Sequence, residues 1–233
     1  MALIRQPSRQ PSRMRSLLIA AVLLINLLGL GLEAISLSLS RKHYEARAAS
    51  LTQNLAYGVE RAVSGNVAKI DLVLQGVTDE LQQQLTNGPL REEAVAAVLE
   101  RHLQRVPELD AIRVSGADGK VWFGRGVNRE APASWADRDF FKIHQSRHDA
   151  GLLVSQPLLG RVSGKWQISF NRRFNYPDGR FAGVVAAPVT LDFLTALLST
   201  LDVGPRGVVI LRDEQLAVIA RYRSEERRVG KEC

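Results

Sequence analysis

The sequence predicts an α+β protein in which a transmembrane helix continues into a long stalk helix and is followed by a domain built on an antiparallel sheet. Three observations predict this class. Residues 17–32 are apolar and uncharged, apolar residues then recur every three or four positions up to residue 85, and beyond residue 108 the apolar period changes to two. Helices followed by a run of strands are typical of α+β proteins.

The first element, residues 17–40, is predicted to cross a membrane. Leu17–Leu32 carries no charge, and apolar character resumes after Glu33 up to Ser40. A helix of about 22–24 residues is about 33–36 Å long, which spans a hydrocarbon core of ~30 Å. A cleaved signal peptide and a buried core helix are the alternatives. The stretch exceeds the ~7–15 apolar residues of a signal peptide, and arginines without acids precede it, so a membrane anchor is favoured.

The segment before this helix, residues 1–16, is a basic tail. It contains four arginines, at positions 5, 9, 13 and 15, and no acidic residue. Positively charged flanks of a membrane helix stay in the cytoplasm. The tail is therefore predicted to be cytoplasmic, and the chain after residue 40 is predicted to lie outside.

A stalk helix is predicted over residues 41–86. Its apolar stripe consists of Leu51, Leu55, Val59, Val63, Val67, Ile70, Leu74, Val77, Leu81 and Leu85. One interpretation is a helix that packs on a core, and the other is a signalling stalk that pairs with its twin in a homodimer. Both can hold for one helix. Asn87-Gly88-Pro89 ends it.

The remaining pattern predicts a second helix over 91–106, stopped by Pro107, and then a hairpin of strands 109–114 and 120–125. A short helix is expected over 137–145, with Asp137 as its N-cap. Strands 152–155, 165–174 and 181–189, a helix over 191–201, and a hairpin of strands 207–211 and 216–221 follow. Strands and helices do not alternate, which argues against a Rossmann-type fold.

Charge and cysteine content narrow the function. The net charge of +7 comes mainly from the two ends of the chain, so the part between is nearly neutral and a nucleic-acid partner is excluded. The segment 223–233, RSEERRVGKEC, resembles the translation of a sequencing-library adapter and is expected to be non-native. It carries Cys233, the single cysteine, so no disulfide and no thiolate site are expected.

Several motifs together resemble the double Cache sensor domains of bacterial transmembrane receptors. They are DRDFF at 137–141, GRVSGKW at 160–166 and PDGRFAG at 177–183, within a similarity that covers residues 45–222. The variant most similar is found in membrane-bound diguanylate cyclases with a GGDEF domain and in some sensor histidine kinases. This chain departs from it at Phe140 or Phe141, where tyrosine is common, and at Asn171, where serine is common.

The resemblance implies a domain organisation. Residues 87–202 would form a membrane-distal PAS-like module, and residues 203–222 would begin a truncated membrane-proximal module. The cytoplasmic effector would follow residue 222. The protein would lie in the bacterial inner membrane with its sensor domain in the periplasm or outside the cell.

The resemblance also implies a ligand site on one face of the sheet. The ligand-binding residues expected from it are Trp122, Asp137, Arg138, Phe141, Arg161, Trp166 and Arg172, with His144 and Arg173 also at matching positions. An arginine offers a planar fork for a carboxylate, and a tryptophan excludes water. The same residues have structural alternatives, because Asp137 and Arg138 can cap a helix and both tryptophans can belong to the core.

These residues point to a small-molecule ligand such as a carboxylate or an amino acid. The sequence contains no nucleophile motif, no phosphate-binding loop and no histidines with ligand spacing, so no catalytic residue, metal or cofactor is expected in this fragment. Three functions remain as hypotheses: a ligand sensor, an interaction or anchoring module without a ligand, and a secreted hydrolase with a signal peptide.

Overall fold

The computed structural model describes residues 11–106, 109–213 and 215–223. The chain divides into two compact units, Met1–Val63 and Ser64–Cys233. Most of the predicted basic tail and the segment 224–233 with Cys233 lie outside the described residues.

One helix, α1 (Pro11–Thr86), contains 76 residues and carries both the predicted membrane segment and the predicted stalk. From Arg13 it is long and apolar enough to cross a membrane, judged by length and composition. Within the first unit its described side chains are mostly exposed, including Leu27 and Leu37. An exposed apolar surface of this length needs an apolar environment, and lipid supplies one.

The last part of α1 is different, because one side of it is buried. Its buried side chains are Ile70, Val73, Leu74, Val77, Thr78 and Leu81. They recur at intervals of three or four residues, so they form the stripe predicted for a helix that packs on a core. Each buried Val or Leu contributes about 1.5–3 kcal/mol. The packing interpretation of the stalk is thus correct for its end, and pairing with a twin stays a prediction.

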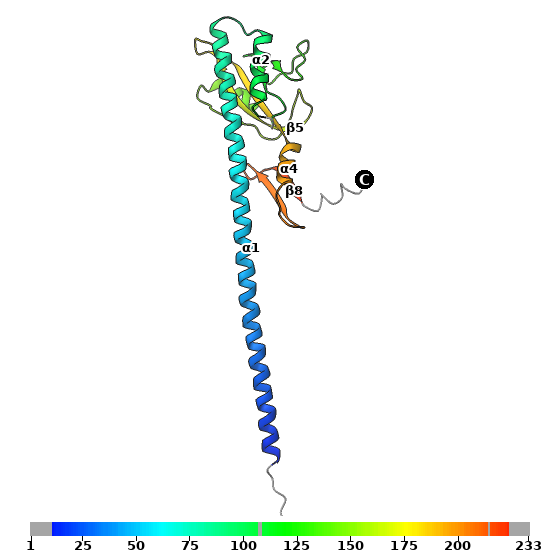
Figure 1. Ribbon diagram of the computed structural model, residues 1–233. Coiled ribbons are helices and arrows are strands. Elements are labelled where there is room, and N and C mark those ends of the chain that lie inside the picture. The colour runs from blue at the N-terminus through cyan, green and yellow to red at the C-terminus, as the bar shows by residue number, and fades with distance from the viewer. Residues whose placement is uncertain (1–10, 107–108, 214, 224–233) are drawn as a thin grey trace, which may run out of the picture. The chain divides into compact units, whose positions relative to one another are not determined.

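The second unit contains an α+β fold, as predicted (Figure 1). Its helices after α1 are α2 (Glu92–Leu103), α3 (Asp139–Ser146) and α4 (Leu191–Ser199). Its strands are β1 (Arg113–Ser115), β2 (Val121–Gly124), β3 (Leu153–Val154), β4 (Leu158–Leu159), β5 (Trp166–Asn175), β6 (Phe181–Thr190), β7 (Val208–Arg212) and β8 (Val218–Arg223). Within the described ranges the main sheet has six strands in the order β2-β1-β6-β5-β3, with β4 also paired to β5.

The antiparallel pair β5–β6 forms the middle of the sheet, and alternation gives it two different faces. On one face Ser169, Asn171 and Arg173 pair across the strands with Pro188, Ala186 and Val184. On the other face Phe170 and Arg172 pair with Ala187 and Val185. Arg172 also bonds to Asp71 of α1, so this second face is the one that α1 covers.

The first face carries its own core cluster. Its buried members are Val121, Trp135, Phe140, Phe141, Val184 and Ala186. Edge-to-face ring contacts join Trp135 to Phe140 and Phe141 to Phe181, with centroids 5.8 and 5.4 Å apart. Such pairs stabilise a core beyond their buried area. The short helix α3 and the loops beside it are held on the sheet by this cluster.

Two local details differ from the prediction. The helix α3 begins at Asp139, and its N-cap is Arg138, whose side chain makes no capping hydrogen bond. Asp137 as the N-cap is therefore wrong, because its carboxylate binds Arg161 instead. The two-residue strand β4 was also not expected, since so short a strand has no period that a sequence can display.

The hairpin β7–β8 forms a separate two-stranded sheet. It packs on α4, and its residues Ala220 and Tyr222 are buried. The predicted strands are confirmed. A hairpin of two strands is at best marginal alone, and the assignment of residues 203–222 to a truncated second module stays a prediction.

We predict that Gly183→Ala destabilises the second unit. A Cβ atom at this position would lie 2.0 Å from the carbonyl oxygen of Ser115, and the backbone has a φ of +157°. The cost should be about 2–3 kcal/mol, which lowers the thermal unfolding midpoint by roughly 5–10 °C. Gly65→Ala, at an open helical position, is the control and should be neutral or stabilising. Equal midpoints for the two variants would contradict the close strand contact.

Candidate ligand-binding site

A small cavity lies on the first face of the sheet, between the start of α3 and the loop that connects β4 to β5. It is lined by Arg113, Trp135, Arg138, Phe140, Leu158, Gly160, Arg161, Val162, Gln167 and Ser169. Three of these residues are arginines, and two are aromatic. The sheet supplies Arg113, Leu158, Gln167 and Ser169, while the other residues come from loops and from α3.

Arg113 is the charged residue buried most deeply at this cavity. It is 5% exposed and sits in β1, opposite Ala186 of β6. Opposed residues in a sheet point to the same side, so its side chain lies on the face that carries the cavity. Its Nε donates to the carbonyl oxygen of Arg125 at 3.2 Å. Burial lowers the pKa of its guanidinium, and the charge of Arg125 acts in the same direction, while Asp110 opposes it.

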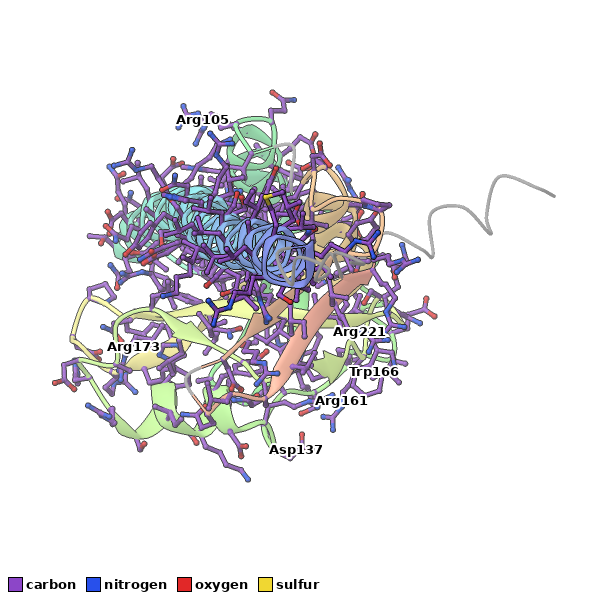
Figure 2. The ribbon with its side chains drawn as sticks, turned by 90° about the horizontal axis from the view of Figure 1, so that it is seen from below. Arg105, Asp137, Arg161, Trp166, Arg173 and Arg221 are labelled. Carbon is purple, nitrogen blue, oxygen red and sulfur yellow. The ribbon has the colours of Figure 1, made fainter. Side chains whose placement is uncertain are left out.

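Arg161 lies at the outer edge of the cavity. Its Nη1 and Nη2 donate to the two carboxylate oxygens of Asp137 at 2.5 and 2.6 Å, and Nη1 also bonds to the carbonyl oxygen of Ser134. Figure 2 shows the two side chains lying beside each other. The hydrogen bond from Arg161 lowers the pKa of Asp137 to about 2. The pair stays charged at neutral pH and ties the loop that carries Arg161 to the segment that precedes α3.

Loop 160–164 fits tightly against β5. A Cβ atom at Gly160 would meet Ser163 Oγ at 2.3 Å and Gln167 Oε1 at 2.5 Å. Ser163 Oγ in turn donates to Gln167 Oε1 at 2.9 Å. Arg138 Nη2 donates to the carbonyl oxygen of Leu159 at 3.0 Å. These bonds fix the loop on both sides of the cavity.

The cavity is small. Its volume is about 20 Å³, which is enough for about one water molecule. A ligand of several heavy atoms would therefore require the loop with Arg161 to move outward. The Arg161–Asp137 pair is the contact that such a movement would have to break.

A larger cleft of about 330 Å³ is lined by residues 200–205 and Tyr222. Two other clefts, of about 320 and 420 Å³, lie elsewhere on the second unit. Both are lined in part by Trp122, which is half-buried. The arginines at the first cleft already have acidic partners, since Arg129 pairs with Glu92 and Arg125 lies 3.6 Å from Glu100. The second cleft has no arginine among its described lining residues. We place the candidate site at the smaller cavity, because the buried Arg113 lines it.

The structure brings together two of the seven residues expected to bind a ligand, Arg138 and Arg161, with Asp137 beside them at the rim. Phe141 is fully buried in the core cluster and does not line the cavity. Trp166 is 58% exposed, so the interpretation of it as a core residue is wrong. Trp122 lies at the larger clefts. The binding role of all seven stays a prediction.

Arg172 and Arg173 point to opposite faces, as expected for neighbours in a strand. Arg172 donates to both oxygens of Asp71 on α1, at 2.5 and 2.9 Å. Arg173 donates to the carbonyl oxygens of His144 and Arg147, each at 2.8 Å, and lies over the Phe181 ring. In Figure 2, Arg173 lies apart from Arg161. Neither residue lines the cavity, and both hold helices to the sheet.

His144, at a position that matches the family pattern, lies in the core. It is fully buried, and its Nε2 is 3.0 Å from the carbonyl oxygen of Asn171. Burial lowers its pKa to about 4, so the ring is neutral at pH 7 and Nε2 donates the hydrogen bond. In the described part of the chain no group of three or more His, Cys, Asp or Glu side chains could hold a metal ion.

Sequence reasoning missed Arg113 and Trp135. Arg113 lies inside the apolar run Ala111–Val114, where a charged residue points either to solvent or to a special site. The run is too short to distinguish these two environments. Trp135 lies in a loop that has no regular period, and its burial follows from its contact with Phe140.

Comparisons with known proteins support the fold. No family model matches the sequence, and no curated protein matches it closely enough to be counted. Among solved structures, the chain is similar to the extracellular domain of rpHK1S-Z16, named as a histidine kinase. The TM-score is 0.58 and the identity 23%, over 71% of this chain and 70% of that chain.

Two chemoreceptor domains are also similar. The ligand-binding domain of Campylobacter jejuni Tlp3 in complex with L-norvaline gives a TM-score of 0.56 at 17% identity, over 82% of this chain and 74% of that one. The domain of Pseudomonas fluorescens CtaA in complex with L-serine gives 0.55 at 19% identity, over 72% and 67%. The fold is therefore that of extracellular ligand-binding domains of receptors. The expected sensor fold is confirmed, and the link to diguanylate cyclases stays a prediction.

We predict that His144 makes the stability of this unit depend on pH. Its folded pKa, about 4, is below the unfolded value of about 6.5. The unfolded chain therefore binds a proton first as pH falls, and stability should decline between about pH 6.5 and 4 by up to about 1.4 kcal/mol per pH unit. His144→Gln keeps a donor for Asn171 and should remove this part of the decline. Urea unfolding of both proteins at several pH values measures it, and identical slopes would contradict the assignment.

Proposed function

We propose that this chain is the sensor part of a transmembrane signalling receptor and that it binds a small carboxylate or an amino acid in the Arg113–Arg161 cavity. Residues 17–40 anchor it in the bacterial inner membrane, with the N-terminus in the cytoplasm and the sensor unit outside. The observation that carries this function is the buried Arg113, which lines a cavity without an ion-pair partner among the described residues.

A buried cation without a counter-charge is costly, and proteins keep such groups mainly where they bind something. A carboxylate that enters the cavity would supply the missing charge and match the planar fork of arginine. Two of the three structures compared above are ligand-binding domains by name, each with an amino acid bound, and the third is named as an extracellular domain. That similarity supports a sensor on this fold and leaves the ligand open.

The proposed route to the output runs through β5. Its residues alternate between the cavity, through Gln167 and Ser169, and α1, through Arg172. The Arg172–Asp71 pair is bidentate, and both side chains are 23% exposed. A ligand that shifts β5 would therefore displace α1, which carries the predicted membrane segment. The proposal also includes pairing of two stalk helices in a homodimer. The output would come from a cytoplasmic diguanylate cyclase or histidine kinase.

One observation favours a second candidate, an interaction or anchoring module without a ligand. The cavity holds about one water molecule, and the Arg161–Asp137 pair closes it. In that case Arg138 and Arg161 would have purely structural roles, and no small molecule would stabilise the unit.

We predict that at least one member of a panel of amino acids and small carboxylates stabilises the full chain in detergent micelles. At about a hundredfold excess over its Kd a ligand adds about 2.7 kcal/mol, which raises the unfolding midpoint by roughly 5–10 °C. Arg138→Gln should reduce this shift, and Arg180→Gln, in an exposed turn outside the cavity, should leave it unchanged. No shift with any compound would favour the module without a ligand.

A further inference from the structure

The charged residues among the described lining of the cavity are all positive. Arg113, Arg138 and Arg161 line it, and none of its described lining residues is acidic. Arg161 is neutralised by Asp137, which leaves Arg113 and Arg138 without a salt-bridge partner among the described residues. A cavity lined by two guanidinium groups without a salt bridge attracts anions and repels cations.

The acidic residues near the cavity are all turned away from it or already bound. Asp137 is engaged by both terminal nitrogens of Arg161, and its side chain is 63% exposed. Asp139 is exposed at the start of α3. Asp110 acts on the charge of Arg113, but it is exposed and does not line the cavity. Asp71 lies on the other face of the sheet with Arg172.

Two neutral polar side chains line the cavity, Gln167 and Ser169. The carbonyl oxygen of Leu159 accepts from Arg138, and that of Ser134 accepts from Arg161. Gln167 Oε1 accepts from Ser163 Oγ, and Ser169 Oγ donates to Asn171 Oδ1. An ammonium group needs several acceptors and preferably a carboxylate. Inside this cavity it would meet three guanidinium groups and no carboxylate among the described lining residues. This charge repulsion discriminates against a ligand with an ammonium group.

From these contacts we infer that the cavity takes a small carboxylate with no ammonium group, and that Arg113 is the residue that binds its carboxylate. This inference rests on the proposed function, because it names the ligand class for the same cavity. The proposed sensor function includes both small carboxylates and amino acids, and this inference distinguishes between them. It also assigns a binding role to a residue that the sequence did not indicate.

Matched ligand pairs test this inference on the full chain in detergent micelles. Succinate and L-aspartate differ by an ammonium group, as do propionate and L-alanine. Succinate or propionate should raise the unfolding midpoint. Titration calorimetry should give its amino-acid counterpart at least a roughly tenfold higher Kd, since the arginines repel the ammonium group and no described lining residue is acidic. Tighter binding of the amino acid within both pairs would overturn the inference and leave the sensor function intact.

Substitution of Arg113 tests its role. Arg113→Gln should weaken the binding of the better carboxylate by about tenfold to a hundredfold, the range for loss of a charged hydrogen bond. Arg113→Lys, which keeps the charge but not the fork, should fall between the two. Arg180→Gln is the matched control and should bind as the wild type does.

The fold of each variant is checked by its circular dichroism and its unfolding midpoint without ligand. If Arg113→Gln unfolds, Arg113→Lys still decides the question. A folded Arg113 variant with unchanged affinity would overturn the assignment of this residue. If none of the four compounds binds the wild-type chain, and the wider panel gives no shift either, the sensor function itself fails.

Discussion

The structure depends on the antiparallel pairing of β5 with β6, because each strand contributes ten residues and alternation forces its side chains onto two faces. One face closes the cavity, and the other packs on α1. A shift of one residue in the register would exchange the faces, sending Arg172 to the cavity and Ser169 to the helix. The bidentate Arg172–Asp71 pair holds the second face of β5 against α1, and the close contact of Gly183 with the Ser115 carbonyl holds β6 beside β1.

Their hydrogen-bond partners divide the arginines of this unit into two groups. Arg161, Arg172 and Arg173 each have bonds that bind one element of the fold to another, and their role in stability follows from those bonds. Arg113 is buried more deeply, and its side chain donates to a backbone carbonyl, that of Arg125. Its position in a short strand leaves the fold with a cation that a ligand can neutralise. The first group therefore stabilises the fold, and Arg113 is available for the proposed recognition of a ligand.

The sequence predicted the long elements well and the site only in part. The helix α1 and the strands β5 and β6 repeat their apolar pattern often enough to be recognised. The acid Asp137 stands where a helix cap is common, but a residue far along the chain, Arg161, competes for it, and no local pattern reveals that contact. Arg113 was missed because three residues of β1 do not show which face is buried. Local sequence patterns cannot predict which side chains meet through tertiary contacts.

The central claim is that β5 carries the state of the cavity on one face to α1 on the other. Hydrogen exchange of the full chain in detergent micelles, with and without succinate, tests it most directly. Exchange should slow in residues 158–164 and in the turns of α1 around Asp71, and Asp71→Asn should keep the first effect and lose the second. Slower exchange at the cavity with an unchanged α1 in the wild-type chain would contradict the claim.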